Sequence, residues 1–403
     1  MKETKFKDTE LGKIPEEWDY GKFEDYLDKF SAGATPYRGI ASNFIGTIPW
    51  VSSGELNYNY ITDTREHISQ DAQKSTHLTL HPKGTFLIAI TGLEAAGTRG
   101  RCAFIETPAT TNQSCLAIYS TEKMIVEYLF WFYQQWSDYL AFNFSQGSKQ
   151  QSFTAEIVKK LPIYAPSLAE QQRIASALFD ADALVAELDA LIEKKRAIMA
   201  GTMQELLTGK RRLKGFSEPW SEEVLRNHLS FLPGFPFTSD RFSKVACGPR
   251  LIRNRDLHSD DQVIYYTGEY SNQYIIEDGD LLIGMDGDFT PCLWNKGNAV
   301  LNQRVGRIIC KNTANIVFLY YLLQKPLAEL QESTGATTVK HLSHSTIENM
   351  VCRMPKLAEQ RAIASILSDM DAEIAELEAK RDKYKEVRQG MMQQLLTGKI
   401  RLI

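Results

Sequence analysis

The most constraining feature of the sequence is a long segment that occurs twice. Residues 168–213 (LAEQQRIASALFDADALVAELDALIEKKRAIMAGTMQELLTGKRRL) align without a gap with residues 357–402 (LAEQRAIASILSDMDAEIAELEAKRDKYKEVRQGMMQQLLTGKIRL), and about 26 of 46 positions are identical. The copies start roughly 189 residues apart, which is too long for a solenoid repeat and suits one domain plus one helix. We therefore expect the order domain, helix, domain, helix.

Weaker similarities precede each copy in the same order. Residues 84–92 (GTFLIAITG) resemble 279–287 (GDLLIGMDG), residues 111–114 (TNQS) resemble 301–304 (LNQR), and residues 12–18 (GKIPEEW) resemble 215–220 (GFSEPW). These similarities predict two domains of one fold, the first domain at residues 1–165 and the second at residues 214–352. Helical segments at residues 166–213 and 353–403 follow them.

The repeated segments are predicted to be helices, because their apolar residues recur every three or four positions, as in a coiled-coil seam. The seam residues are Ile174, Leu178, Val185, Leu188 and Ile192, and then Ile363, Leu367, Met370, Ile374 and Leu377. Pro166 and Pro355 precede the helices, while Gly209 and Gly398 suit C-caps, so each helix should run for about 37 residues. Because the chain leaves one domain along the first helix and returns along the second, we expect an antiparallel, pseudo-twofold coiled coil.

The domains themselves are predicted to be mixed α/β (α+β). Short apolar or alternating runs bounded by Gly, Pro and Asn indicate strands, and longer aromatic runs indicate one helix in each domain. The expected strands are 47–52, 85–91, 101–105 and 114–119 in the first domain and 263–267, 280–285, 300–302 and 305–310 in the second. The expected helices are 121–142 and 314–332.

Charge and cysteine content exclude several classes of protein. The net charge is −4 and the pI is about 6.1, whereas a nonspecific nucleic-acid coat protein needs a basic excess. Each domain carries about −3 by count, so DNA binding would need local basic spots or a basic partner. None of the six cysteines has zinc or CxxC spacing. Without a signal peptide or an apolar span of about 20 residues, we expect a soluble, cytoplasmic protein.

A family resemblance follows from the duplicated segments and the domain openings. Two variable domains, each opened by a G-x-I-P-x-x-W-like start and closed by an L-A-E-Q…L-L-T-G-K helix, resemble the specificity subunits of type I restriction-modification enzymes over the whole chain. The second opening departs from the pattern at its entry turn, with Phe216–Trp220 in place of Ile14–Trp18.

The resemblance implies a non-catalytic DNA-reading subunit. Each domain would read one half of a bipartite, asymmetric site in double-stranded DNA, and the helices would set the spacer and dock two modification (methyltransferase) subunits. Those partners would bind S-adenosylmethionine and methylate adenine, so no cofactor is expected in this chain, and restriction (translocase and nuclease) subunits could join the complex.

The residues themselves give no pattern of catalytic chemistry. The chain has no Pro-Pro pair for a methyltransferase base-holding motif and no Gly-Lys followed by Ser or Thr for a P-loop. Asp278, Asp280, Asp286 and Asp288 could form a metal site, but their D-G and G-D dipeptides favour turn carboxylates. The histidine pair His341 and His344 lacks zinc spacing. We therefore expect neither a catalytic nor a metal site.

Candidate base-reading residues are polar side chains on loops held by the sheets, because arginine and lysine suit guanine edges while asparagine and glutamine suit adenine. In the first domain they are Ser52, Ser53, Asn57, Arg99, Arg101, Gln146, Ser148, Lys149 and Gln150. In the second they are Arg250, Arg253, Asn254, Arg255, Arg304, Thr337, Thr338, Lys340 and His341. For any one of them a solvated loop is as good an interpretation. Asn112–Gln113 and Asn302–Gln303 recur in both domains, which favours a structural or phosphate-binding role.

Two other functions fit parts of the pattern. A heptad stripe alone also suits a coiled-coil adaptor between proteins without DNA specificity. A self-sufficient DNA enzyme with an unrecognised site is the second alternative. Methylation tests with and without modification subunits would separate the three hypotheses.

Overall fold

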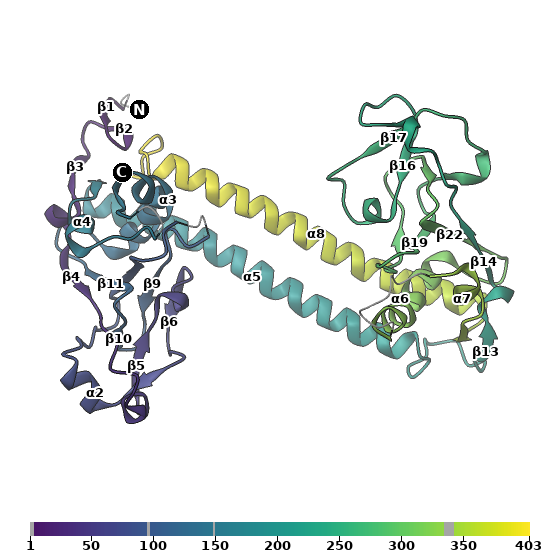
Figure 1. Ribbon diagram of the computed structural model, residues 1–403, viewed down its shortest axis with the longest axis horizontal. Coiled ribbons are helices and arrows are strands. Elements are labelled where there is room, and N and C mark those ends of the chain that lie inside the picture. The colour runs from purple at the N-terminus through teal and green to yellow at the C-terminus, as the bar shows by residue number, and fades with distance from the viewer. Residues whose placement is uncertain (1–3, 95–96, 148–149, 334–341) are drawn as a thin grey trace. The chain divides into compact units, whose positions relative to one another are not determined.

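The computed structural model describes residues 4–94, 97–147, 150–333 and 342–403. The chain forms two compact units, unit 1 (Met1–Leu188 with Lys380–Ile403) and unit 2 (Asp189–Ala379). Each unit contains one α/β domain and one end of each long helix, α5 (Leu168–Leu206) and α8 (Leu357–Leu395) (Figure 1). The mixed α/β class, with two tandem domains and two long helices, is therefore confirmed. The exact domain boundaries stay a prediction, because the compact units divide both helices.

The centre of unit 1 is a five-stranded sheet. Its order is β4 (Asp28–Ala32), β11 (Cys115–Tyr119), β8 (Phe86–Ala89), β9 (Cys102–Ile105) and β6 (Asn59–Ile61). Only the β6–β9 pair is parallel. A second sheet has the order β10 (Thr110–Thr111), β5 (Ile48–Val51) and β7 (His67–Ile68). The four strands predicted in the first domain are thus confirmed with slightly shorter bounds.

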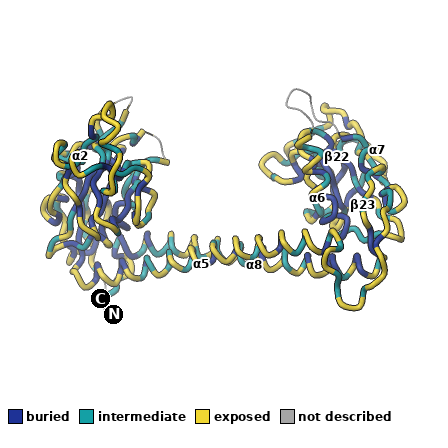
Figure 2. The backbone as a smooth tube through the Cα atoms, turned by 90° about the horizontal axis from the view of Figure 1, so that it is seen from below, coloured by how far each residue is buried: buried dark blue, intermediate teal, exposed yellow. Residues whose placement is uncertain are grey.

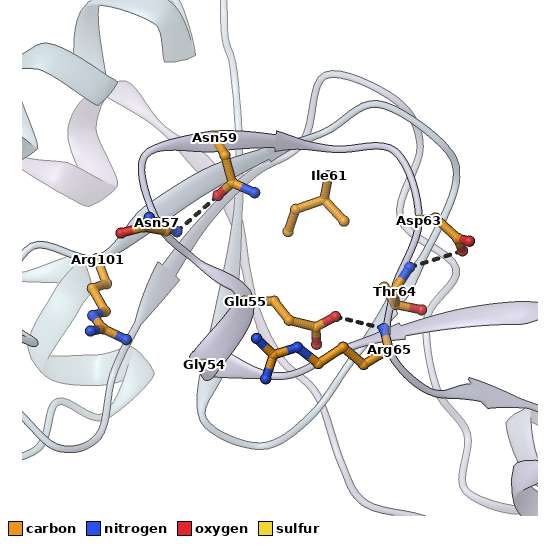
Figure 3. Close-up of a pocket in the computed structure, with 9 residues that line it drawn as sticks. All are labelled: Gly54, Glu55, Asn57, Asn59, Ile61, Asp63, Thr64, Arg65 and Arg101. Carbon is orange, nitrogen blue, oxygen red and sulfur yellow. Dashed lines mark hydrogen bonds between the residues drawn. The ribbon is translucent and has the colours of Figure 1, made fainter. Parts of the chain in front are cut away.

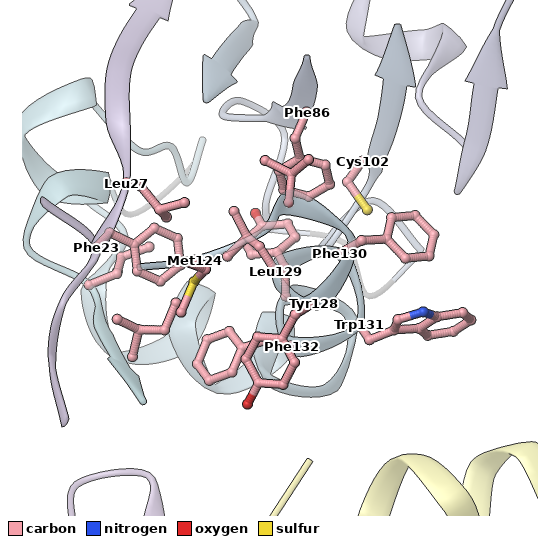
Figure 4. Close-up of a cluster of buried hydrophobic side chains, with 14 of the residues drawn as sticks. Phe23, Leu27, Phe86, Cys102, Met124, Tyr128, Leu129, Phe130, Trp131 and Phe132 are labelled. Atoms are coloured by element: carbon pink, nitrogen blue, oxygen red, sulfur yellow. The ribbon is translucent and has the colours of Figure 1, made fainter. Parts of the chain in front are cut away.

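Both faces of the central sheet are buried, because alternate residues along its strands point to opposite sides. Phe86 and Ile88 of β8 belong to the same core as the aromatic helix α3 (Val126–Phe144), whereas Leu87 packs in a second core with Val51 of the other sheet. Figure 4 shows the α3 side of this packing, with the helix contributing most of the rings. The apolar runs in the sequence therefore mark strands covered on both faces.

Smaller elements complete unit 1. They are β1 (Phe6–Thr9), β2 (Gly12–Pro15), β3 (Asp19–Lys22), α1 (Phe23–Tyr26), α2 (Gln70–Ser75), α4 (Ala155–Lys159) and β12 (Pro162–Ala165). The prediction that the aromatic helix begins at Thr121 was wrong by five residues. Thr121 instead forms a turn, with its N–H donating to the Met124 carbonyl. The Ile125 N–H donates to the Gln171 side chain and fixes the start of α3 (N···O 3.1 Å).

Unit 2 repeats this plan with two sheets of different size, one of four strands and one of five. Its four-stranded antiparallel sheet has the order β14 (Leu229–Pro233), β22 (Val305–Cys310), β19 (Leu281–Gly284) and β20 (Cys292–Leu293). The second sheet has the order β15 (Phe242–Ser243), β17 (Ile264–Tyr266), β16 (Arg250–Ile252), β21 (Ala299–Leu301) and β18 (Ile275–Ile276). Helix α6 (Ile316–Ser333) corresponds to α3, and α7 (His344–Glu348), β13 (Ser221–Val224) and β23 (Val351–Met354) complete the domain. The predicted strands and helix of this domain are confirmed.

The long helices pair antiparallel within each unit. In unit 1 the start of α5 shares a core with the end of α8, through Leu178 and Met392 among others. In unit 2 the end of α5 packs with the start of α8, through Ile192 and Ile363. The predicted seam residues are buried or half-buried, while much of the remaining helix surface is exposed (Figure 2). In the described part of the chain, no helix is both long enough and apolar enough to cross a membrane.

A buried clasp joins each domain to the helices. In unit 1 the Glu170 carboxylate accepts hydrogen bonds from the Trp18 indole (3.2 Å) and from the Arg401 guanidinium (2.7 and 2.8 Å). In unit 2, Glu359 accepts the same bonds from Trp220 (3.0 Å) and Arg212 (2.7 and 2.7 Å).

The clasp explains the repeated motif residues. The buried carboxylate comes from L-A-E-Q, and the arginine follows L-L-T-G-K. Gly398 has a φ of +67°, and a Cβ there would lie 2.3 Å from a Pro15 carbon, so a glycine is required at this approach. Although the second domain opens with a different turn, its Trp220 still reaches the clasp.

Candidate nucleic-acid interface

Each domain has a short 3-10 turn at the end of a strand that pairs in parallel with a neighbour. In the first domain, η2 (Ser53–Glu55) follows β5, and the Glu55 carboxylate accepts bonds from the Ser52 N–H (2.8 Å) and hydroxyl (2.7 Å). In the second, η5 (Asn254–Leu257) follows β16, and Asp256 accepts the Arg253 N–H (2.9 Å). The two domains thus hold this loop by the same carboxylate-to-backbone contact.

A polar pocket of about 580 Å³ lies beside the η2 turn in the first domain (Figure 3). It is lined by Gly54, Glu55, Asn57, Asn59, Ile61, Asp63, Thr64, Arg65 and Arg101. The structure therefore brings together Asn57 and Arg101, two of the predicted DNA-contacting residues, next to Ser52 and Ser53. Whether they contact DNA stays a prediction.

Arg99 lies apart from this pocket lining and its guanidinium is engaged within the domain. It donates to the carbonyls of Leu93 (2.8 Å) and Glu94 (3.0 Å), and its side chain is only 15% exposed. A neighbouring loop packs beside it, since the Gln151 N–H donates to the Glu94 carboxylate (3.1 Å). Gln146 pairs through its backbone with Ser152. Arg99 thus holds the backbone of Leu93 and Glu94, and the Glu94 side chain in turn contacts Gln151.

The basic spot predicted in the second domain is largely neutralised by carboxylates. Arg250 pairs with Asp260 and lies over the Trp294 ring at 5.2 Å, while Arg253 bonds both Asp256 oxygens (2.7 and 2.9 Å). Hydrogen bonds from Arg250, and then from Lys296, lower the pKa of Asp260. These arginines therefore have partners that a DNA contact would have to replace.

Three further predicted residues of the second domain differ in their exposure and in their contacts within the protein. Arg255 is exposed, with a 3.4 Å contact to Gln262, and Arg304 pairs with Asp286 at 3.1 Å while staying 52% exposed. The Asn254 amide donates to the Asp286 carbonyl, so it holds the turn. The remaining candidates, Ser148, Lys149, Thr337, Thr338, Lys340 and His341, lie outside the described residues. Gln150 is exposed.

The recurring asparagines have structural contacts. The Asn112 N–H donates to the Val51 carbonyl (2.8 Å), and the Asn302 N–H donates to the Ile252 carbonyl (3.1 Å). Each asparagine side chain also accepts a nearby backbone N–H (3.0 and 2.9 Å). These bonds tie the same loop to the same strand end in both domains, as expected for a shared structural feature.

The acidic residues of the second domain act as turn and ion-pair carboxylates. Asp278 accepts the Gly297 N–H (2.7 Å), Asp280 pairs with Arg307 (3.1 Å), and Asp288 accepts the Thr290 N–H (2.9 Å). In the described ranges, no group of three or more His, Cys, Asp or Glu side chains could hold a metal ion. The contacts agree with the turn interpretation.

Sequence reasoning missed five polar residues of the pocket, namely Glu55, Asp63, Thr64 and the two whose side chains carry N–H donors, Asn59 and Arg65. Both lie in a stretch without clear strand alternation, so no pattern placed them beside Asn57. It also missed the clasp role of Glu170 and Glu359, although the recurrence of Trp, Glu and Arg in both repeats was a usable signal.

The chain matches the family model described as "Type I restriction modification DNA specificity domain" over residues 15–195 and 243–386. It is 33% identical over 193 residues to the type I restriction enzyme EcoBI specificity subunit of Escherichia coli, covering 47% of this chain and 41% of that subunit. It is 26% identical to the MjaIX specificity subunit of Methanocaldococcus jannaschii, covering 99% and 97% of the two chains.

Solved structures share the fold. The S subunit of a type I restriction-modification system from M. genitalium superposes with a TM-score of 0.61 at 14% identity, covering 94% of this chain and 96% of that one. A structure concerned with complex assembly and conformational transition of the type I R-M system gives 0.58 at 16% identity, covering 96% and 99%. Since the family model matches most of the chain and includes parts of both domains, the chain belongs to the type I restriction-modification DNA specificity family, whose function is DNA sequence specificity.

Proposed function

We propose that this chain is the non-catalytic DNA-specificity subunit of a type I restriction-modification complex, in which each domain reads one half of a bipartite, asymmetric site. The observation that carries the proposal is the pair of domains with one fold, one clasp and different loop side chains, within a chain that the specificity family model matches in both halves. Two domains of one fold with different loop side chains are suited to recognising two different half-site sequences.

The candidate base contacts rank by how free their side chains are. Asn57 and Arg101 in the first domain, and Arg255 and Arg304 in the second, are the strongest, because their polar ends face an open pocket or solvent. Arg99 and Arg253 rank lower, since internal acceptors occupy their guanidinium groups. Replacing an internal hydrogen bond by one to DNA gains little net free energy.

 

The partners follow from the same proposal. Two modification subunits would dock on α5 and α8, supply the bound S-adenosylmethionine and methylate adenine, and restriction subunits could join them in the cytoplasm. Because each domain is net acidic, the isolated chain should bind DNA weakly at physiological salt, and the modification subunits should supply the missing phosphate contacts.

Reconstitution tests the proposal directly. The chain mixed with modification subunits, S-adenosylmethionine and a randomised duplex library should direct methylation to one split sequence, and the chain alone should methylate nothing. Methylation by the chain alone would show a self-sufficient enzyme. Binding to the subunits without any sequence preference would show an adaptor.

The spacer role of the helices has its own test. Inserting four residues after Leu188 and four after Leu377 lengthens each helix by about 6 Å, and changing both together keeps their seam matched. Since DNA advances about 3.4 Å per base pair, the preferred spacer should grow by one or two base pairs while both half-sites stay the same. An unchanged spacer preference in an active complex would show that the helices do not set this distance.

A further inference from the structure

The polar pocket of the first domain presents several donors that are not used inside the protein. Within the described residues, no other side chain forms a hydrogen bond or ion pair with the guanidinium of Arg65 or Arg101 or with the side-chain amide of Asn57. The Arg101 Nε donates to a backbone group, the Gly97 carbonyl (3.1 Å). Asn59 uses only its oxygen, which accepts the Asn57 N–H (2.8 Å). Two guanidinium groups and two amides therefore face one cavity (Figure 3).

The carboxylates of the pocket are already engaged. Glu55 accepts the Ser52 N–H and hydroxyl and the Arg65 N–H (2.8 Å), and Asp63 accepts the Thr64 N–H (2.9 Å) and contacts His67 (2.8 Å). They nevertheless leave negative charge at the wall. A site for phosphate alone would be weakened by that charge, whereas a base edge offers both donors and acceptors.

The loop that carries Asn57 and Asn59 is held in one strained conformation. Tyr58 between them has a φ of +57°, in the left-handed region that a bulky residue rarely adopts. Its N–H donates to the Cys102 carbonyl (2.8 Å) and its hydroxyl to the Arg99 carbonyl (3.3 Å). Such strain persists only where the surroundings fix it, so the two amides are presented in advance of binding.

The second domain has the same frame with other side chains. Arg253 and Asp256 take the places of Ser52 and Glu55 in the turn, and the residue after the following leucine is His258 instead of Asn57. The shared part is the backbone contact, and the differing part is the side chains beyond it. This division is expected if the frame supports the loop and the side chains choose the base.

We infer that the first domain reads a purine of its half-site in this pocket, with Arg65 and Asn59 as specificity-determining residues beside Asn57 and Arg101. Arginine can pair with the O6 and N7 atoms of guanine, and asparagine with the N6 and N7 atoms of adenine. The inference rests on the proposed function, because it names the ligand of one reading loop.

The test compares base preferences at single positions. The complex with modification subunits would be used to select bound duplexes from a library with a randomised split site, for the natural chain and for Arg65→Lys, Arg65→Ala and Asn59→Ala. Lysine keeps the charge for a phosphate but loses the planar fork that pairs with a purine. We expect Arg65→Lys to reduce discrimination at one purine of one half-site by about 5- to 150-fold, with the other half-site unchanged.

Arg38→Lys serves as the matched control, since Arg38 lies outside the pocket and pairs with Glu66. It should leave every base preference unchanged. An unaltered other half-site shows that each variant is folded. Equal weakening at all sequences, or no change in any variant, would overturn the inference. A natural chain that selects no split sequence would instead refute the proposed function.

Discussion

The two domains share one fold and one clasp, yet they pack differently against the long helices. The Gln171 side chain accepts the N–H just before α3, and the Gln360 side chain accepts the N–H just before α6. These equivalent contacts align the two helices, so that Trp131 corresponds to Tyr321 and Trp136 corresponds to Pro326. In unit 1, Trp136 donates to the Tyr164 hydroxyl (2.8 Å) and fills the space beside the helix. In unit 2, the corresponding space is part of an apolar cavity of about 970 Å³ lined by residues that include Pro326 and Arg353.

The residues of the long helices differ in the same way, with an aromatic ring in unit 1 and a small side chain beside a cavity in unit 2. Phe179 of α5 packs on the rings of Phe130 (5.5 Å) and Trp131 (5.1 Å), whereas Ser368, its counterpart in the repeat, lines a cavity of about 460 Å³ in unit 2. The clasp and the glutamine contacts before α3 and α6 are thus shared, whereas the side chains that pack between each domain and the long helices differ. Duplication preserved the contacts that fix the helix ends, and it left the packing between them free to change.

The largest expected effect comes from breaking the shared clasp. Glu170→Ala leaves the Trp18 and Arg401 donors buried without their acceptor, so unit 1 should lose about 3–5 kcal/mol of unfolding free energy. Glu359→Ala should do the same in unit 2. Hydrogen exchange resolved by unit would locate each loss. Glu17→Ala is the control, because Glu17 contacts Arg401 from an exposed position. A Glu170→Ala variant that weakened unit 2 instead would contradict the assignment.

The aromatic packing predicts a smaller and one-sided effect. Phe179→Ala removes a half-buried ring from the contacts with Phe130 and Trp131, so unit 1 should lose about 2–3 kcal/mol. Ser368→Ala, the equivalent change in unit 2, should alter stability by less than about 0.5 kcal/mol. Denaturant unfolding of both variants would measure the difference. Equal losses would show that the two joints are packed alike.

A buried histidine should make unit 1 the more acid-sensitive. Burial lowers the pKa of His81 from 6.5 to about 4, and its ring bonds the Tyr119 hydroxyl (2.7 Å). Because the folded-state pKa is depressed, folding favours the neutral ring, so its contribution is present above pH 6.5 and is lost as the pH falls toward about 4. The loss between pH 7 and pH 4 should be about 3 kcal/mol.

The second domain supplies the matched variant for this prediction. His81 bridges Ala109 where Ile276 pairs with Ala299, so His81→Ile copies the second domain. In this variant, the unfolding free energy should no longer show the histidine-dependent loss as the pH falls. Denaturant midpoints between pH 7 and pH 4 would measure it. A natural chain whose unit 1 kept its full stability at pH 4 would contradict the prediction.

The order of domains and helices could be predicted from the sequence because duplication and heptad spacing are strong local signals. The main strands were predictable for a related reason: Phe86–Ala89 and Leu281–Gly284 are buried on both faces and form apolar runs. Strands β4 and β14 were missed, since Asp28–Ala32 and Leu229–Pro233 lie at sheet edges and mix polar with apolar residues.

The pocket was only partly predictable. Asn57 and Arg101 stood out as polar residues next to strands, but they are 44 positions apart and only the β6–β9 pairing brings their segments together. The partners of Arg250 and Arg253 were equally hidden, because Asp260 and Asp256 reach them through turn geometry. The sequence therefore identified basic side chains, but only the fold shows which of them have partners within the protein.

The smallest expected effect concerns a helix pair that the repeat does not share. Arg388 of α8 pairs with Asp182 of α5, whereas Met199 and Asp371 occupy the equivalent positions in unit 2. Both members of the Arg388–Asp182 pair are partly exposed, so screening by water leaves little net attraction. Arg388→Met should therefore change the stability of unit 1 by less than about 1 kcal/mol in either direction, as read from hydrogen exchange of α8. A loss as large as that of Glu170→Ala would show that this ion pair, and not only the clasp, fixes the end of the helix.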